Sequence, residues 1–322
     1  QARAGSGGGI MRRGSVAGAA DPLLLLGPTL VLLGAALLAA RLYPLAARAA
    51  ARLARGPALL WPYAVARLGR AGDHGWPIVL VATLATGLSL FAVLSDSSIA
   101  AHQAVTARFL AGADVRAGLP IDARPEAAQA LAGLEGATAA SPVYRNDRIR
   151  WAAELGRQSA LLAIDPATFG RVAGLQPPAG GPDLAAILAA LETSSGAAIP
   201  AVFSPDAPPQ AKRVGDVVSY VVGTQRVDFE IRGVINTFPS LRGPFILANL
   251  PLLERRADFT TFTEPWIGQR EMWLAAGPGQ GAALAAAVRR GDGPPGSSLL
   301  ASAADIEQEL AADMAAQQTA AA

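Results

Sequence analysis

The sequence predicts a membrane protein with two transmembrane helices and one large α+β domain outside the membrane, carried on helical stalks. Three observations lead to this prediction. Two uncharged apolar runs lie near the N-terminus, an arginine-rich segment separates them, and the chain beyond them mixes strand and helix patterns. The composition agrees, because 16% of the residues are charged and 52% are hydrophobic, whereas soluble globular proteins carry about 25% charged residues.

The two apolar runs have nearly the length that a transmembrane helix needs. Residues 23–40 and 78–94 contain no charged side chain, and about 20 such residues cross the hydrocarbon layer. Pro28 lies inside the first run, where a membrane helix tolerates it if neighbouring helices satisfy the freed backbone groups. Arg41 after the first run and Trp76 before the second are expected to anchor the helices at the membrane interface.

The arginines between the runs predict the orientation of the chain. Residues 41–75 contain six arginines and one aspartate, so by the positive-inside rule this segment is cytoplasmic and the rest lies outside. The alternative starts from Met11, Arg12 and Arg13, which precede an apolar run as in a signal sequence or twin-arginine leader. That alternative places the tail inside, but six loop arginines outweigh two.

The cytoplasmic segment contains a short amphipathic pattern. Trp61, Val65 and Leu68 fall on one helical face, which suits a helix lying in the headgroup layer. This helix is either a plain surface anchor or a contact for a cytoplasmic partner. In the second case Trp61, Arg67 and Arg70 are the candidate contact residues.

Local patterns predict the elements of the outer domain. A helical continuation of the second span over residues 95–111 is expected to form a stalk. Strands are expected at residues 113–117, 140–144, 148–153, 159–164, 198–203, 245–248 and 271–275, with a hairpin within 216–235. Helices are expected at residues 124–134, 165–172, 183–193 and 282–290, and an amphipathic helix at 302–322. Because the order follows no strict βα period, α+β is predicted rather than a doubly wound sheet.

These expectations divide the chain into six segments. They are an outer tail (1–21), a transmembrane helix (22–43), a basic cytoplasmic loop (44–75), a second transmembrane helix (76–98), the outer α+β domain (99–300) and a stalk helix (301–322). The last helix ends without a third apolar run, so we expect this chain to be a piece of a longer protein.

Several kinds of chemistry are not expected. The chain has no cysteine, and a phosphate-binding loop needs a lysine before Ser or Thr, whereas the only lysine, Lys212, precedes Arg213. His74 and His102 lie on opposite sides of the predicted membrane and cannot share a metal. The glycine-rich residues 277–282 fit a strand-to-helix turn better than a dinucleotide site. We therefore expect no bound cofactor, no metal and no catalytic activity.

Charge is divided unevenly along the chain. Residues 1–94 hold nine Arg and two Asp, a charge of +7, and residues 95–322 hold 18 basic and 23 acidic residues, a charge of −5, which together give the net +2. Basic residues beside apolar runs indicate a membrane surface rather than a nucleic acid as partner.

Four segments of the outer part, taken in their order, resemble the FtsX-like permease family of ABC transporters, which includes MacB-type and lipoprotein-releasing permeases. The segments are SIAAHQAVTARFLAGADVRA (98–117), LLAIDPATFGRVAG (161–174), VGDVVSYVVGTQRVDFEIRGVINTFPSL (214–241) and GPFILANLPLL (243–253). Residues 21–56 look like the last membrane helix of an upstream permease unit. The chain thus resembles the junction of two tandem units and lacks the remaining helices of either.

The resemblance implies a function by mechanotransmission in a bacterial cell membrane. A separate cytoplasmic ATPase would bind ATP, and the stalks at 95–111 and 302–322 would move a MacB-like periplasmic core domain. That movement would export or release a lipoprotein, peptide, drug or lipid of the cell envelope. The resemblance also implies a dimer of permease units.

Two other functions are compatible with the residues. The chain could be a membrane-anchored adaptor or sensor that regulates an extracellular partner such as a cell-wall hydrolase. It could also be an anchored extracytoplasmic enzyme, although no catalytic set of residues is visible in the sequence.

Overall fold

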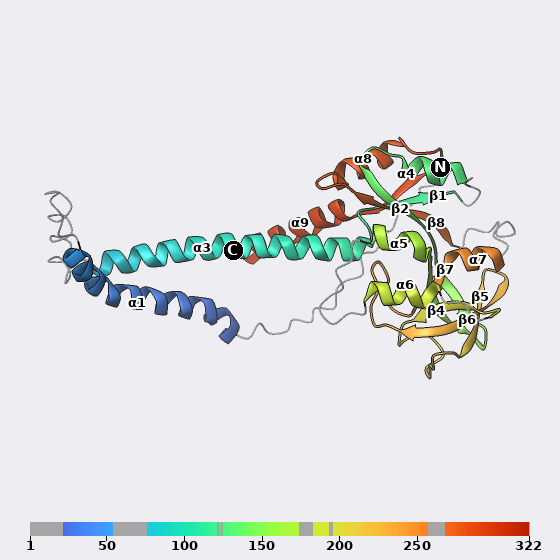
Figure 1. The fold of residues 1–322 in the computed structure, drawn as a ribbon, viewed down its shortest axis with the longest axis horizontal. Helices are drawn as coiled ribbons and strands as arrows, with labels where there is room; N and C mark the ends of the chain where they lie inside the picture. Colours follow the sequence, from blue (N-terminus) through green and yellow to red (C-terminus); the bar gives the residue numbers. More distant parts are fainter. Residues whose placement is uncertain are drawn as a thin grey trace. The chain divides into compact units, whose positions relative to one another are not determined.

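The computed structural model describes residues 22–53, 76–120, 123, 125–173, 183–192, 196–256 and 268–321 (Figure 1). The chain divides into two compact units, Gln1–Ile99 and Ala100–Ala322. The boundary between the units lies inside α3 (Trp76–Ala111), a helix of 36 residues.

The first unit contains α1 (Pro22–Leu53) and the N-terminal part of α3. α1 continues through Pro44, so the predicted first span and the start of the predicted loop form one helix. The two helices approach at Gly87, where an added Cβ would lie 2.9 Å from Leu32 Cδ2. Small residues at such positions let helix backbones pack closely, as they do in pairs of membrane helices.

Within the described residues, one helical stretch is long and apolar enough to cross a membrane. It is Leu80–Ala111, with a mean hydropathy of 1.5, and none of its apolar window is buried in the structure. α1 contributes a shorter apolar stretch, Leu30–Ala46. The second predicted span therefore meets the requirements of length and composition, whereas the two-span architecture stays a prediction.

The second unit is an α+β domain, as the sequence predicts, and it begins with the end of α3. Its strands are β1 (Val115–Leu119), β2 (Ala137–Trp151), β3 (Glu154–Ile164), β4 (Ile199–Phe203), β5 (Val217–Val222), β6 (Gln225–Val234), β7 (Phe245–Asn249), β8 (Gln269–Ala276) and β9 (Ser298–Ser302). Its helices are α4 (Pro125–Ala132), α5 (Pro166–Val172), α6 (Leu184–Glu192), α7 (Leu250–Arg256), α8 (Gly281–Arg290) and α9 (Ala303–Ala321).

Six of the strands close into a barrel. The order β3-β7-β4-β6-β5-β2 is completed by a second pairing between β2 and β3, so the ring has no free edge. Its interior is filled by apolar side chains, including Tyr220, Phe203 and Phe229. The ring centroids of Tyr220 lie 6.2 Å from Phe203 and 6.1 Å from Phe229, distances at which aromatic pairs attract one another.

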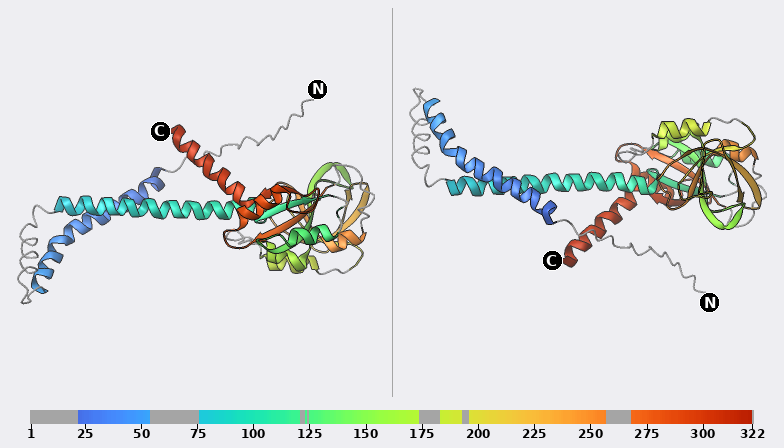
Figure 2. Two further views of the ribbon diagram at one scale, coloured as in Figure 1. Left: turned by 90° about the horizontal axis from the view of Figure 1, so that it is seen from above. Right: turned by 90° about the horizontal axis from the view of Figure 1, so that it is seen from below.

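β2 belongs to two layers because it is 15 residues long. Its first half pairs with β8, and β8 continues through β1 to β9 as an antiparallel sheet. α4 and α8 pack on this sheet around Leu131, Leu284 and Val288, whereas α5 and α6 pack beside the barrel around Phe169 and Leu191. Figures 1 and 2 show the two lobes joined by β2, with α9 projecting away from the sheet.

Three helices of the second unit begin at a polar side chain that caps the first turn. The Asp165 carboxylate accepts from Ala167 N at 3.1 Å, and the Asp183 carboxylate accepts from Ala185 N at 3.1 Å. Ser302 Oγ accepts from Asp305 N at 3.0 Å at the start of α9. Each of these polar side chains satisfies a backbone donor that the first turn leaves free, and these three starts confirm the prediction.

The structure corrects the predicted elements in three places. The strands expected at 140–144 and 148–153 are one strand, β2, because it pairs with β8, β3 and β5 along its length. α7 and β9 were not predicted. β9 follows a turn-rich stretch, and its pairing with β1 is a long-range contact without a local signal.

Candidate functional site

The candidate functional site is the junction where α3 ends against the sheet of the second unit. Gly112 N donates to Arg108 O at 2.8 Å and closes the helix. Gly112 has a φ of +91°, and a Cβ there would lie 2.6 Å from Trp273 Cη2. Only glycine suits this backbone conformation and this close approach, so the end of α3 meets the indole of Trp273 without an intervening side chain.

A buried ionic cluster lies directly behind this junction, on three adjacent strands. Glu271 of β8 is the centre, with a side chain that is 0% exposed. Arg116 of β1 donates to it twice, with Nη2–Oε1 at 2.8 Å and Nε–Oε2 at 2.9 Å. Arg145 of β2 donates through Nε at 3.0 Å and Trp273 through Nε1 at 2.7 Å. The carboxylate therefore accepts four hydrogen bonds.

The electrostatics of the cluster favour its charged form. Burial alone would raise the pKa of Glu271, but Arg116, Arg145 and the Trp273 N–H together outweigh burial and hold that pKa below its ordinary value. Burial lowers the pKa of Arg145, and the neighbouring Arg116 lowers it further, while Glu271 and Asp147 raise it. Two guanidinium groups thus share one buried carboxylate, and the cluster carries an excess positive charge.

The cluster is hydrogen-bonded to the end of α3 by two routes. Arg116 Nη1 donates to Ala111 O at 3.3 Å. Arg145 Nη2 donates to Ser240 Oγ at 2.6 Å, and Nη1 donates to Ser240 O at 3.3 Å. Ser240 N in turn donates to Phe109 O at 3.1 Å. A displacement of the end of α3 along the helix axis would therefore be transmitted through these hydrogen bonds to β1, to β2 and to the segment around Ser240.

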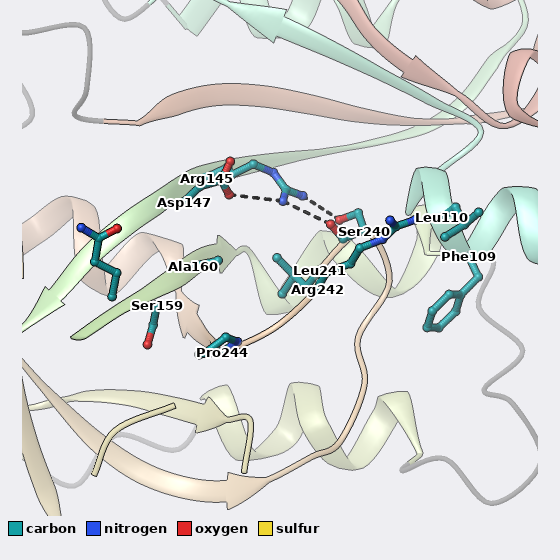
Figure 3. Close-up of a pocket in the computed structure, with 11 residues that line it drawn as sticks. Phe109, Leu110, Arg145, Asp147, Ser159, Ala160, Ser240, Leu241, Arg242 and Pro244 are labelled. Atoms are coloured by element: carbon teal, nitrogen blue, oxygen red, sulfur yellow. Dashed lines mark hydrogen bonds and ion pairs between the residues drawn. The ribbon is translucent and has the colours of Figure 1, made fainter. Parts of the chain in front are cut away.

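Ser240 adopts a backbone conformation that non-glycine residues rarely use, with a φ of 61°. Such positions persist when surrounding contacts determine them, and here the contacts are the two bonds from Arg145 and the bond to Phe109 O. Figure 3 shows Arg145 between Asp147 and Ser240, with its guanidinium directed toward the end of α3.

A cavity of about 470 Å³ lies beside this junction. Phe109 and Leu110 of α3 form part of its wall, together with Arg145, Asp147 and Arg242 (Figure 3). The Arg242 side chain is exposed. The cavity thus combines an apolar wall with two cationic groups and one carboxylate.

The residues singled out from the sequence are a different set from those that form this junction. Trp61, Arg67 and Arg70, the candidate ATPase contacts, lie outside the described residues. Trp76 begins α3, and Arg41 lies exposed in α1. Their roles as partner contacts and as interface anchors stay predictions.

Sequence reasoning missed the ionic cluster. Arg116 and Glu271 are 155 residues apart and Arg145 and Glu271 are 126 apart, so no local spacing brings them together. One signal was present: Glu271 stands before Met272 and Trp273 in a strand of buried apolar residues, and a charge there requires partners.

The glycine-rich segment and one of the histidines considered in the sequence analysis lie at a turn and on an exposed helix surface. Of residues 277–282, the first four form the turn between β8 and α8, where Gln280 N donates to Gly277 O at 2.9 Å, and the last two begin α8. His102 is exposed on α3. Among the residues that the structure describes, no group of three or more acidic or histidine side chains is arranged to hold a metal ion.

Comparison with known proteins finds no match by sequence and a low structural likeness. No family model matches the chain, and no curated protein matches it. One similar solved structure is the extracellular domain of the noncanonic ABC-type transporter YknZ from Gram-positive bacteria. The identity is 13% and the TM-score 0.33, over 58% of this chain and 98% of that chain. A likeness at this level carries no argument about the function of this chain.

Proposed function

We propose that this chain is part of the permease subunit of a bacterial ABC transporter that works by mechanotransmission. A separate cytoplasmic ATPase supplies the energy, and this chain, which is not itself an enzyme, converts it into movement of the outer domain. The movement exports or releases an envelope substrate such as a lipoprotein, a peptide or a drug. The chain itself binds no ATP, and two permease units act together in the cell membrane.

The observation that carries this proposal is the path from α3 into the sheet. α3 runs without a break from the predicted span to Ala111, and its last turn is hydrogen-bonded to Arg116 and to Ser240. A helix with all its backbone bonds formed is stiff along its axis. Because Arg116 and Arg145 share Glu271, a shift of α3 reaches three strands together.

Two of the segments that carry the family resemblance are in contact at the end of α3, where Ser240 N donates to Phe109 O. Residues 98–117 include the end of α3 and β1, and residues 214–241 include the β5–β6 hairpin and Ser240. Residues 161–174 and 243–253 contain the end of β3 and the whole of β7, two strands that pair in parallel. The proposal thus rests on a sequence resemblance whose parts meet in space.

The first test is the partner. Full-length protein carrying this chain, purified in lipid nanodiscs, should bring with it a cytoplasmic ATP-binding subunit, and charge reversal at Arg67 and Arg70 should weaken that association. Recovery without any ATP-binding protein would contradict the proposal. Capture of an extracellular hydrolase alone would favour the membrane-anchored adaptor instead.

The second test is the transmission path. Ala104, exposed on α3, is replaced by proline, which removes a helix hydrogen bond and kinks the helix; Ala104→Ser is the matched control. Both variants should bind the ATPase, and nucleotide should change the distance between spin labels on α3 and on the outer domain only in the control. An equal change in both variants would show that α3 does not transmit the movement.

A further inference from the structure

We propose that the cavity beside the end of α3 binds a small amphiphile that carries one carboxylate on an apolar body. The inference concerns the second unit alone and does not depend on the presence of an ATPase partner. Three properties of the cavity support it: unbalanced positive charge, an apolar wall, and a volume that suits a small ligand.

The two arginines that line the cavity have N–H groups without a hydrogen-bond partner in the described part of the chain. Arg145 makes hydrogen bonds to Glu271 and to Ser240 through three of its N–H groups, and a guanidinium has five. Arg242 has no hydrogen bond or ion pair with any group in the described part of the chain. A ligand carboxylate could thus accept from both arginines, in the manner that guanidinium groups favour.

The carboxylate already near the cavity leaves room for a second anion. Asp147 Oδ1 lies 3.7 Å from Arg145 Nη1, beyond hydrogen-bond distance, and its side chain is 68% exposed. Exposed ion pairs of this kind contribute little. Because Asp147 can turn toward water, it weakens anion binding without preventing it, and its removal should strengthen that binding.

The apolar wall selects the body of the ligand. Phe109 and Leu110 come from α3, and Leu241 and Pro244 come from the segment that follows Ser240. A volume of about 470 Å³ is at the lower end of the range for small-molecule sites, roughly 300–1,000 Å³. A medium-chain fatty acid or an acylated dipeptide with a free C-terminus has suitable size and shares the required chemistry.

The position along α3 favours a free molecule over a lipid still held in the bilayer. If the span ends near residue 98, as the sequence predicts, Phe109 lies 11 residues further along the helix. At a rise of about 1.5 Å per residue, that is roughly 16 Å. The ligand therefore reaches the cavity from solution or after extraction from the membrane.

Isothermal titration calorimetry on the whole chain in zwitterionic nanodiscs tests the inference, with empty nanodiscs as the blank. The probes are octanoate and N-acetyl-leucyl-leucine, each compared with its neutral amide. Each carboxylate that binds should do so at least about tenfold more tightly than its amide, because charge-assisted hydrogen bonds are stronger than neutral ones. Saturation by octanoate alone identifies a fatty acid, and saturation by the peptide alone identifies a peptide C-terminus.

Three variants test whether the carboxylate binds in this cavity. Arg242→Ala should weaken carboxylate binding about tenfold and leave amide binding unchanged, and Asp147→Asn should strengthen carboxylate binding. Arg148 is an exposed arginine next to Asp147 on β2 and does not line the cavity. Arg148→Ala should therefore change neither carboxylate binding nor amide binding. No saturable binding of either carboxylate, equal binding of carboxylate and amide, or an Arg148→Ala effect as large as that of Arg242→Ala would overturn the inference.

Discussion

Glu271 is the residue that holds the junction together. It accepts hydrogen bonds from Arg116, Arg145 and Trp273 while fully buried. Its two arginines are in turn hydrogen-bonded to the last turn of α3 and to Ser240. One carboxylate therefore determines the position of groups from four separate parts of the chain.

Glu271→Gln should destabilise the second unit by about 3–5 kcal/mol, because it removes the buried carboxylate that two buried guanidinium groups share. Asp292→Asn is the control, since Asp292 pairs with Arg290 at 2.7 Å on the exposed surface, and such pairs contribute about 1 kcal/mol or less. Urea unfolding followed by near-ultraviolet circular dichroism measures both. Equal losses in the two variants would contradict the central role of Glu271.

Acid should abolish the difference between wild type and Glu271→Gln. The folded pKa of Glu271 lies below its ordinary value, so the unfolded chain takes up the proton first as the pH falls. The stabilisation is complete above the ordinary carboxyl pKa of about 4.3 and is lost as the pH falls through the folded pKa. Unfolding curves from neutral pH downward would show the two stabilities converge only in that acidic range.

Tyr220 should resist ionisation in alkali. Burial raises its pKa to about 12, against about 10 for a free tyrosine, and its hydroxyl donates to Pro208 O. The folded state therefore keeps the proton longer, so the stabilisation is complete below about pH 10 and is lost as the pH rises toward the folded value. Burial also raises the pKa of Tyr144, so ultraviolet titration should show two late tyrosinates, of which Tyr220→Phe removes one. An unchanged titration curve in Tyr220→Phe above the ordinary tyrosine pKa would exclude this burial effect.

At the scale of elements, the sequence predicted correctly those helices and strands whose formation depends on neighbouring residues. The helix starts at Asp165, Asp183 and Ser302 and the β5–β6 hairpin each depend on neighbouring residues, and each was predicted. The closure of the barrel through β2 and β3 depends on pairing between strands whose sequence patterns carry no partner information. The ionic cluster was missed for the same reason, because its members are brought together only by the order of β1, β8 and β2 in the sheet.

Gly112→Ala should disturb the joint between α3 and the sheet. The added Cβ would lie 2.6 Å from the Trp273 ring at a φ of +91°. Gly215→Ala is the matched control, since Gly215 has a φ of +98° and no atom within 4 Å of an added Cβ. Both variants carry the backbone strain, so the additional loss of about 1–3 kcal/mol in Gly112→Ala measures the steric conflict. Equal stabilities would mean that Trp273 moves aside freely.

At the scale of the whole molecule, the uneven charge matches the division into two units. The residues before residue 95 carry a net charge of +7, and the part beyond carries a net charge of −5. The apolar helix Leu80–Ala111 joins the two parts. The positive-inside rule predicts that the arginine-rich segment lies in the cytoplasm, and the two-span arrangement stays a prediction.

Cysteine labelling tests this topology. Because the sequence contains no cysteine, the label reacts with no native thiol of this chain. In intact cells a membrane-impermeant maleimide should label Val214→Cys, whose native side chain is 70% exposed. It should label Ala71→Cys, between the two apolar runs, only after permeabilisation, because the positive-inside rule predicts that this arginine-rich segment is cytoplasmic. Ser15→Cys should be labelled from outside. Labelling of Ala71→Cys but not Ser15→Cys in intact cells would instead support the leader alternative, and labelling of all three sites would exclude the two-span arrangement.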